Sequence, residues 1–133
     1  MQKIHIKIQM AYNFRRLITD YPDESSAVEF FRTRGLLHDQ RECKLCGTMM
    51  RLSYRTQNDK QIPVWRCTSK PCKSTLGLRV DTWFHPSTLD FDKIMQFIYW
   101  WSHGKTSISF CERELEIGHC TVIDWNMYMR EVP

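Results

Sequence analysis

The sequence contains no apolar run long enough to cross a membrane. A membrane helix requires about 20 predominantly apolar residues, but the best run here, from Ile94 to Trp101, is short and is interrupted by Gln96. The amino terminus mixes polar and apolar residues and has no small-residue cleavage site, so no secretory signal is expected. In a chain without a secretory signal, cysteines are more often metal ligands or buried thiols than partners in disulfides.

The sequence also lacks any pattern typical of a catalytic site. Such a site requires a nucleophile, a base and an orienting group at compatible positions. Asp90, Asp92 and Asp124 are too dispersed to form one. Four histidines have no nucleophile at a recognisable spacing: His5, His38, His85 and His103. We therefore expect the protein not to be an enzyme.

The sequence does contain a concentrated positive charge. The 133 residues carry a net charge of +4. Between Arg41 and Val80, nine basic residues stand against two acidic ones, which gives this region a charge of +7. Between Asp90 and Pro133, four basic residues stand against seven acidic ones, which gives −3. A concentrated cationic surface suits a polyanion such as nucleic acid; the alternative is an ordinary solvated surface.

Hydrophobic patterning predicts an α+β fold in three parts. Residues 1–40 form an amino-terminal arm and helix, residues 41–86 a small antiparallel zinc ribbon, and residues 87–133 a helical region. The first helix is expected from about Ser25 to Arg34 and is ended by the glycine that follows. Nearer the amino terminus, three alternating isoleucines indicate either a short strand or a mobile arm: Ile4, Ile6 and Ile8.

The middle part predicts two or three short strands joined by turns. The strands are expected over residues 49–55, 62–67 and 76–84, with a polar turn over residues 56–60. None of them is long enough to build a stable sheet alone. An additional stabilising element is therefore required in this part.

The last part predicts three helices in the order typical of a helix-turn-helix. The first begins at Leu89-Asp90 and ends before Gly104, and Ser107 can cap the second. The third, from Thr121 to Glu131, places three apolar residues on one face: Val122, Trp125 and Met129.

Four cysteines occur in two closely spaced pairs. Two residues separate Cys43 from Cys46, four separate Cys67 from Cys72, and a stretch of hairpin length lies between the pairs. Four thiolates at about 2.3 Å complete the tetrahedral coordination of Zn²⁺ and leave no position for a reactive water. The spacing therefore predicts a structural zinc site.

Paired cysteines have three other common roles. A redox-active CxxC usually lies in a thioredoxin-like βαβ setting, which this sequence does not show. Two disulfides require an oxidising compartment. An iron–sulfur cluster can also use four cysteines, and it remains an alternative to zinc.

Several motifs occur in a fixed order along most of the chain. They are Phe30-Phe31…Gly35-Leu36-Leu37, Cys43-Lys44-Leu45-Cys46-Gly47, Trp65-Arg66-Cys67…Cys72, Leu78-Arg79…Thr82-Trp83-Phe84…Ser87…Leu89 and Thr121-Val122-Ile123-Asp124-Trp125…Arg130-Glu131-Val132. In these motifs the sequence resembles the amino-terminal region of transposases of the Merlin superfamily and their bacterial insertion-sequence relatives.

This resemblance implies a helix, a zinc ribbon and a helix-turn-helix that recognise the terminal DNA of a transposable element, in the nucleus for a domesticated derivative. In the family these parts precede a catalytic domain with an acidic metal-binding triad. The present sequence reaches Pro133 at about the point where that domain would begin. We therefore expect either a shortened, domesticated derivative or a fragment, without transposition activity of its own.

The leading interpretation is a DNA-binding protein. The last helix is poor in cations, since Arg130 is its only fixed positive charge, so its contacts with base edges are expected from residues near its start. The phosphate-binding residues are expected on the ribbon. The candidates are Arg51, Arg55, Lys60, Lys70, Lys73 and Arg79 for phosphates, and His119, Thr121 and Asp124 for base edges.

The second interpretation is an adaptor that binds a protein of a nuclear complex. Aromatic residues and methionine are favoured at the centres of such interfaces. The candidates for an exposed docking surface are Tyr99, Trp100, Met127 and Tyr128. Three tryptophans are expected in the core instead: Trp83, Trp101 and Trp125.

Overall fold

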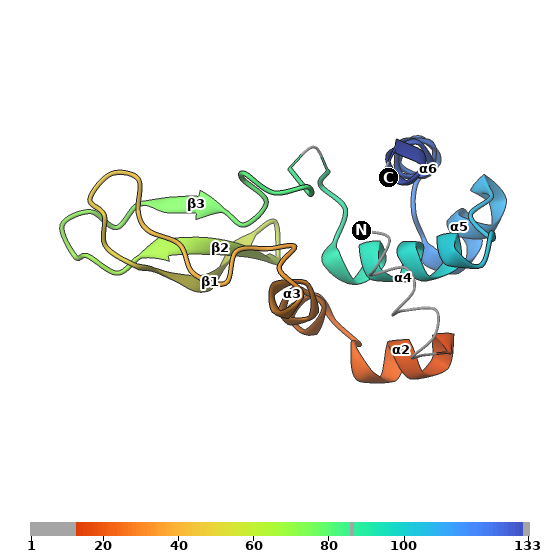
Figure 1. The fold of residues 1–133 in the computed structure, drawn as a ribbon, viewed down its shortest axis with the longest axis horizontal. Helices are drawn as coiled ribbons and strands as arrows, with labels where there is room; N and C mark the ends of the chain where they lie inside the picture. The colour runs from red at the N-terminus through yellow and green to blue at the C-terminus, as the bar shows by residue number, and fades with distance from the viewer. Residues whose placement is uncertain (1–12, 86, 132–133) are drawn as a thin grey trace. The chain divides into compact units, whose positions relative to one another are not determined.

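The computed structural model describes residues 13–85 and 87–131, and this part of the chain contains both helices and a small antiparallel sheet. The predicted α+β class is confirmed. The alternating Ile4, Ile6 and Ile8 lie outside the described residues. The elements are α2 (Phe14–Asp20), α3 (Glu24–Thr33), β1 (Met50–Gln57), β2 (Lys60–Cys67), β3 (Thr75–Gly77), α4 (Phe91–Ser102), α5 (Ile108–Leu115) and α6 (His119–Glu131) (Figure 1).

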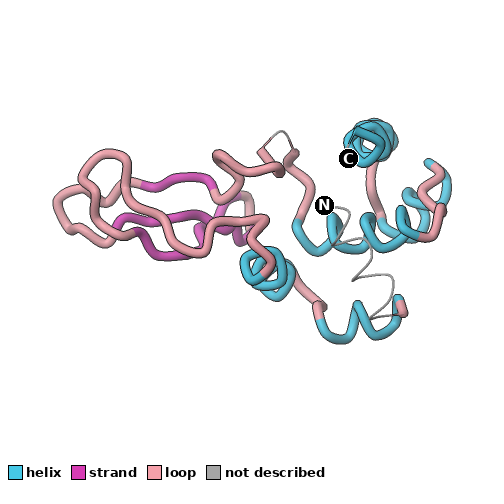
Figure 2. The backbone as a smooth tube through the Cα atoms, in the orientation of Figure 1, coloured by secondary structure: helices cyan, strands magenta, loops and turns pink. Residues whose placement is uncertain are grey.

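The described residues fall into two compact units. The sheet unit comprises residues 28–88, and the helical unit comprises the described residues up to Ala27 together with those from Leu89 onward. Figure 2 shows that strands occur in the sheet unit only, where loops connect them. No helix in the described part is long and apolar enough to span a lipid bilayer.

The helical unit is built around α4. Helix α4 contacts α2 and α5, and α5 contacts α6. Aromatic rings pack between the helices of this unit: the ring centroids of Phe14 on α2 and Trp100 on α4 lie 4.9 Å apart, and those of Phe97 on α4 and Trp125 on α6 lie 6.0 Å apart. The buried side chains are Leu17, Ala27, Phe91, Ile94, Met95, Phe97, Ile98, Tyr99, Cys111, Leu115, Ile117, Val122, Trp125 and Met129.

The N-terminal cap of α5 agrees with the sequence prediction, whereas that of α4 differs from it. The Ser107 side chain accepts the backbone N–H of Phe110 and caps α5, as predicted. Asp90 occupies the N-cap position of α4 but makes no side-chain capping bond. The carboxylate of Glu24, from the first turn of α3, instead accepts the N–H of Phe91 at 3.0 Å. The capping hydrogen bond of α4 therefore comes from a residue that is distant in the sequence.

The sheet is antiparallel in the order β1-β2-β3. Asn58 and Asp59 connect β1 to β2, and both have positive φ angles, 53° and 61°. This geometry is typical of a two-residue type I′ turn, whose twist matches that of the flanking strands. The turn is shorter than the expected 56–60. The third strand is also shorter than expected, because turns follow Gly77 and Asp81 has a φ of 62°.

One face of the sheet belongs to the apolar core of the sheet unit. Trp65 is 2% exposed, and the guanidinium of Arg32 on α3 lies 5.6 Å from its ring centroid. Phe31 of α3 packs against Phe84 at 5.0 Å. The sequence placed Trp83 and Trp101 in the core, but both are half-buried. Trp125 is buried as predicted.

Candidate metal centre and its cationic surroundings

The four paired cysteines converge at one end of the sheet. Their sulfur atoms all lie within 4.8 Å of one another, with 3.7 Å between Cys43 and Cys72 and 3.4 Å between Cys46 and Cys67. A tetrahedral ion with thiolates at about 2.3 Å would place the sulfurs about 3.8 Å apart. A disulfide requires about 2.05 Å, and all four thiols are free. The predicted clustering is confirmed, and the donor set fits a tetrahedral divalent ion.

Two tight turns present these sulfurs. In the first turn the N–H of Cys43 donates to Thr48, and the N–H of Gly47 donates to Cys43, both at 2.8 Å. Gly47 has a φ of 76°, a left-handed conformation that glycine adopts without a steric cost. In the second turn the N–H of Cys67, at the end of β2, donates to Ser74 at 2.8 Å. These backbone hydrogen bonds shape both turns so that each presents its sulfurs to the cluster.

Hydroxyl groups beside the cluster favour ionisation of two thiols. The Ser74 hydroxyl lies 3.0 Å from the Cys43 sulfur and is the main cause that lowers the pKa of Cys43 to about 6. The Thr48 side chain, 3.3 Å from the Cys46 sulfur, is the main cause that lowers the pKa of Cys46. Ser74 and Thr48 thus stabilise the thiolate forms of Cys43 and Cys46 from outside the cysteine motif. Sequence reasoning missed both residues.

Cys67 is shifted in the opposite direction. The backbone N–H of Ser69 lowers its pKa, but burial and the neighbouring sulfurs of Cys46, Cys43 and Cys72 outweigh this effect and raise the pKa to about 12. Several thiolates at such short distances repel one another. A divalent cation reverses that repulsion and favours full ionisation. A cation bound among the four sulfurs would therefore stabilise the ionised form of Cys67.

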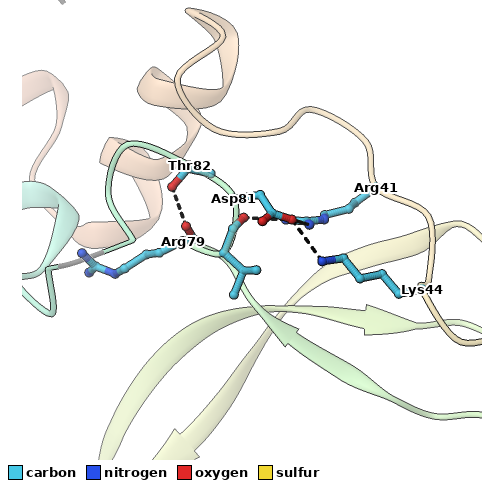
Figure 3. Close-up of polar contacts among 6 residues, drawn as sticks. Arg41, Lys44, Arg79, Asp81 and Thr82 are labelled. Atoms are coloured by element: carbon cyan, nitrogen blue, oxygen red, sulfur yellow. Dashed lines mark hydrogen bonds and ion pairs between the residues drawn. The ribbon is translucent and has the colours of Figure 1, made fainter.

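A three-residue ionic group, Arg41, Lys44 and Asp81, lies beside the first cysteine turn. Buried Arg41 donates to the backbone carbonyl of Val80 and to the Asp81 carboxylate, both at 2.6 Å, and Lys44 reaches the same carboxylate at 3.1 Å. Figure 3 shows both cations converging on Asp81. Hydrogen bonds from Lys44 and then Arg41 lower the pKa of Asp81. Two of the nine basic residues of the cationic region thus share one carboxylate.

The predicted phosphate-binding residues differ in exposure. The exposed ones are Arg51, Arg55, Lys60, Lys70 and Lys73. Arg79 is half-buried, and Figure 3 shows its side chain extending away from Asp81. Within the described residues, no ion pair involves Arg51, Arg55, Lys70 or Lys73. These four cations are therefore available to an external anion.

The predicted base-reading residues belong to α6, in the helical unit. His119 begins the helix, and its Nδ1 lies 3.7 Å from the Glu112 carboxylate. Thr121 is half-buried, and Asp124 is exposed. They lie on a different unit from the cationic sheet.

The four predicted docking residues are not equally accessible. Tyr99 is 6% exposed, so the expectation of an exposed surface there is wrong. Its position on α4 brings it next to Phe14 of α2, at 5.7 Å, a helix that the sequence did not predict. Trp100 and Tyr128 are half-buried, and Tyr128 packs edge-on against Trp125. Met127 is exposed.

Comparison of the sequence and structure with known protein families, curated proteins and solved structures finds no match.

Proposed function

We propose that the sheet unit is a structural zinc ribbon and that the protein is a non-catalytic, nuclear DNA-binding module. The observation that carries this proposal is the convergence of four thiols beside exposed cations that have no carboxylate partner. The motif order shared with the amino-terminal region of Merlin-superfamily transposases supports the same function.

The ligand set favours a structural role for the ion. Four protein sulfurs occupy every position of a tetrahedral zinc site, so no position is left for a water or a substrate. The ion would join the turn before β1 to the end of β2 and the turn after it. It would therefore fix the short hairpin that carries Arg51 and Arg55.

The charges favour DNA as the ligand. Cations without internal partners can each neutralise a phosphate and release a counterion. In this proposal the ribbon supplies those contacts, and α6 inserts His119, Thr121 and Asp124 toward base edges as the second helix of a helix-turn-helix. The scarcity of cations on α6 means that the ribbon supplies most of the affinity.

Metal analysis and a salt-dependent titration test the proposal together. Purified protein should contain one zinc per chain, and its affinity for a mixed-sequence DNA duplex should fall linearly with salt on a double-logarithmic plot. Replacing exposed Lys70 and Lys73 with glutamine should reduce the slope by about 1–2. The matched control is Arg15→Gln with Arg16→Gln on α2, which removes the same charge from the helical unit.

Absence of zinc, or a duplex affinity too weak to measure at low salt, would contradict the proposal. A slope reduced equally by the Lys70/Lys73 pair and by the α2 control would indicate a general charge effect and no ribbon contact.

A protein-docking adaptor is the second candidate, and one observation favours it. Ile123 and Met127 on α6 are 45% and 44% exposed and are separated by four positions, so they share one face of the helix. Exposed apolar pairs of this kind are typical of helix-mediated contacts. A complex recovered from nuclear extract that survives nuclease treatment and is lost in Ile123→Ser/Met127→Ser would favour the adaptor.

A further inference from the structure

The register of β1 and β2 collects basic side chains on one face of the sheet. Side chains alternate between faces along a strand, and directly paired residues share a face. Arg51 pairs with Arg66, Arg55 with Ile62, and Gln57 with Lys60. The face opposite the apolar core therefore carries four basic residues, which we call the cationic face: Arg51, Arg55, Lys60 and Arg66.

The closest pair on this face is Arg51 and Arg66. Directly opposed residues in antiparallel strands have Cβ atoms about 5 Å apart, and like charges at such positions destabilise the sheet. Neither arginine has an ion-pair partner within the described part of the chain. The next pair along the ladder is Met50 with Cys67, at the edge of the cysteine cluster. The metal centre would therefore hold this repulsive pair in place.

The remaining side chains of the face are small, neutral or aliphatic. The aromatic residues of the hairpin, Tyr54 and Trp65, lie on the opposite face by the same alternation. Single-stranded nucleic acid is usually bound by aromatic side chains on which bases stack. The cationic face offers none. The other members of the face are Ser53, Gln57, Ile62, Val64, Thr75 and Gly77.

The segment after β3 limits the open part of this face. A Cβ built on Gly77 would lie 3.6 Å from Val80, so Val80 covers the face at β3, beside Val64. The hydrogen bond from Arg41 to the Val80 carbonyl fixes the backbone of Val80 at this position. Val64, in the middle of β2, is 2% exposed, and Arg66 is half-buried. The open part of the face thus consists mainly of β1, where Arg51 and Arg55 lie about 13 Å apart along the strand, with Arg66 at its edge.

We infer that Arg51 and Arg66 jointly bind a backbone phosphate of duplex DNA, that Arg55 extends the contact along the backbone, and that this binding is independent of sequence. The inference rests on the proposed DNA-binding function and adds a specific phosphate site, with Arg66 as a residue that sequence reasoning did not select. A guanidinium can donate two parallel hydrogen bonds to phosphate oxygens. A bound phosphate also replaces the repulsion between the two arginines with attraction.

The test measures DNA binding and protein stability in the same variants. For the double variant Arg51→Gln/Arg66→Gln, the slope of log affinity against log salt for a mixed-sequence duplex should fall by about 1.8. The melting temperature of the metal-loaded protein without DNA should stay unchanged or rise, because a like-charge pair has been removed. The α2 variant Arg15→Gln/Arg16→Gln is again the control, and its salt slope should remain that of the wild type.

The single variants sharpen the result. Either Arg51→Gln or Arg66→Gln alone relieves the repulsion, so the second substitution should add no further stability, and the cycle should be non-additive. The conservative variant Arg51→Lys/Arg66→Lys keeps both charges, so its slope should match the wild type while its affinity falls through loss of the bidentate geometry. The lysine variant also tests whether Arg51 and Arg66 bind a phosphate if the glutamine variant fails to fold.

Distinct outcomes separate failure of this inference from failure of the proposed function. If wild-type protein binds the duplex with its expected slope and Arg51→Gln/Arg66→Gln binds identically, the inference is overturned and the proposed function stands. Tighter binding to a single strand than to the duplex overturns it as well. Faster zinc loss in the variant with an unchanged slope would assign the arginines to charge balance at the metal centre. No duplex binding by the wild type would overturn both proposals.

Discussion

The helical unit buries a large set of apolar side chains contributed by four helices, whereas the sheet unit has strands of eight, eight and three residues and a smaller core. Hydrophobic burial stabilises the first unit in the ordinary way. A two-stranded hairpin alone is marginal in water, and the sheet unit adds to it only a three-residue strand and the packing of α3. One chain thus contains two kinds of unit: apolar area dominates the helical unit, whereas the proposed metal centre would add stability to the smaller core of the sheet unit.

Metal removal should produce the largest difference between the units. A chelator should abolish hydrogen-exchange protection in β1 and β2, because structural zinc sites contribute about 10–16 kcal/mol in small metal-dependent domains. Protection in α4 and α6 should persist. The variant Cys67→Ser should reproduce the loss, and Cys120→Ser, an exposed cysteine outside the cluster, should not. Retained protection of the sheet in chelator would show that the sheet unit folds without an ion.

Two buried tryptophans allow the units to be perturbed separately. Trp125→Ala should destabilise the helical unit by about 3–5 kcal/mol, because it removes a large side chain from a packed core. Trp65→Ala should destabilise the sheet unit by a similar amount and accelerate zinc release. Denaturant unfolding followed by helix signal and by metal release measures both effects. If each substitution affected both signals equally, the two units would unfold as one.

An intermediate effect is expected from the polar contact that fixes α6. Asn126 donates to the backbone carbonyl of Thr106 at 2.8 Å and accepts the Thr106 hydroxyl at 2.7 Å. Asn126→Ala should cost about 1–3 kcal/mol, since half-buried partners lose their hydrogen bonds. The exposed neighbour Met127→Ala is the control and should change stability by less than about 0.5 kcal/mol. Equal effects from the two variants would show that the contact between Asn126 and Thr106 does not contribute to stability.

The smallest effect is expected at Asp81. Asp81→Asn weakens its contacts with Arg41 and Lys44 but leaves the bond from Arg41 to the Val80 carbonyl. The melting temperature should fall slightly at low salt, and the difference should disappear as salt rises, because Asp81 is exposed and its interactions are screened. Duplex affinity should rise slightly, because the sheet unit gains net positive charge. Glu114→Gln, at an exposed pair on α5, provides the control.

Local patterns in the sequence predicted much of the fold. Helix α3 differs from its predicted bounds by one residue at each end, and α6 buries the three residues expected on its inner face. The cysteine pairs converge as their spacing indicated. These features depend on neighbours within one or two turns of the chain, so the periodicity and capping residues are sufficient to find them.

Features that depend on distant residues were not predictable in the same way. The pair of Arg41 and Asp81 joins positions 40 residues apart, and the opposition of Arg51 and Arg66 depends on the register of the hairpin. Helix α2 is only seven residues long with one buried residue, Leu17, so its periodicity is too short to recognise. The capping residue Asn13 was the one available signal for it.

The two-residue connection between β1 and β2 constrains how the length of this hairpin can vary. A one-residue slip in the pairing of β1 with β2 would turn the side chains of one strand over, exposing Met50 or Trp65 and directing arginines toward the core. Changes of two residues, or one accommodated by a bulge, would preserve the inward and outward alternation. Related chains that keep this surface should therefore differ at the hairpin tip by two residues, or by one residue accompanied by a bulge.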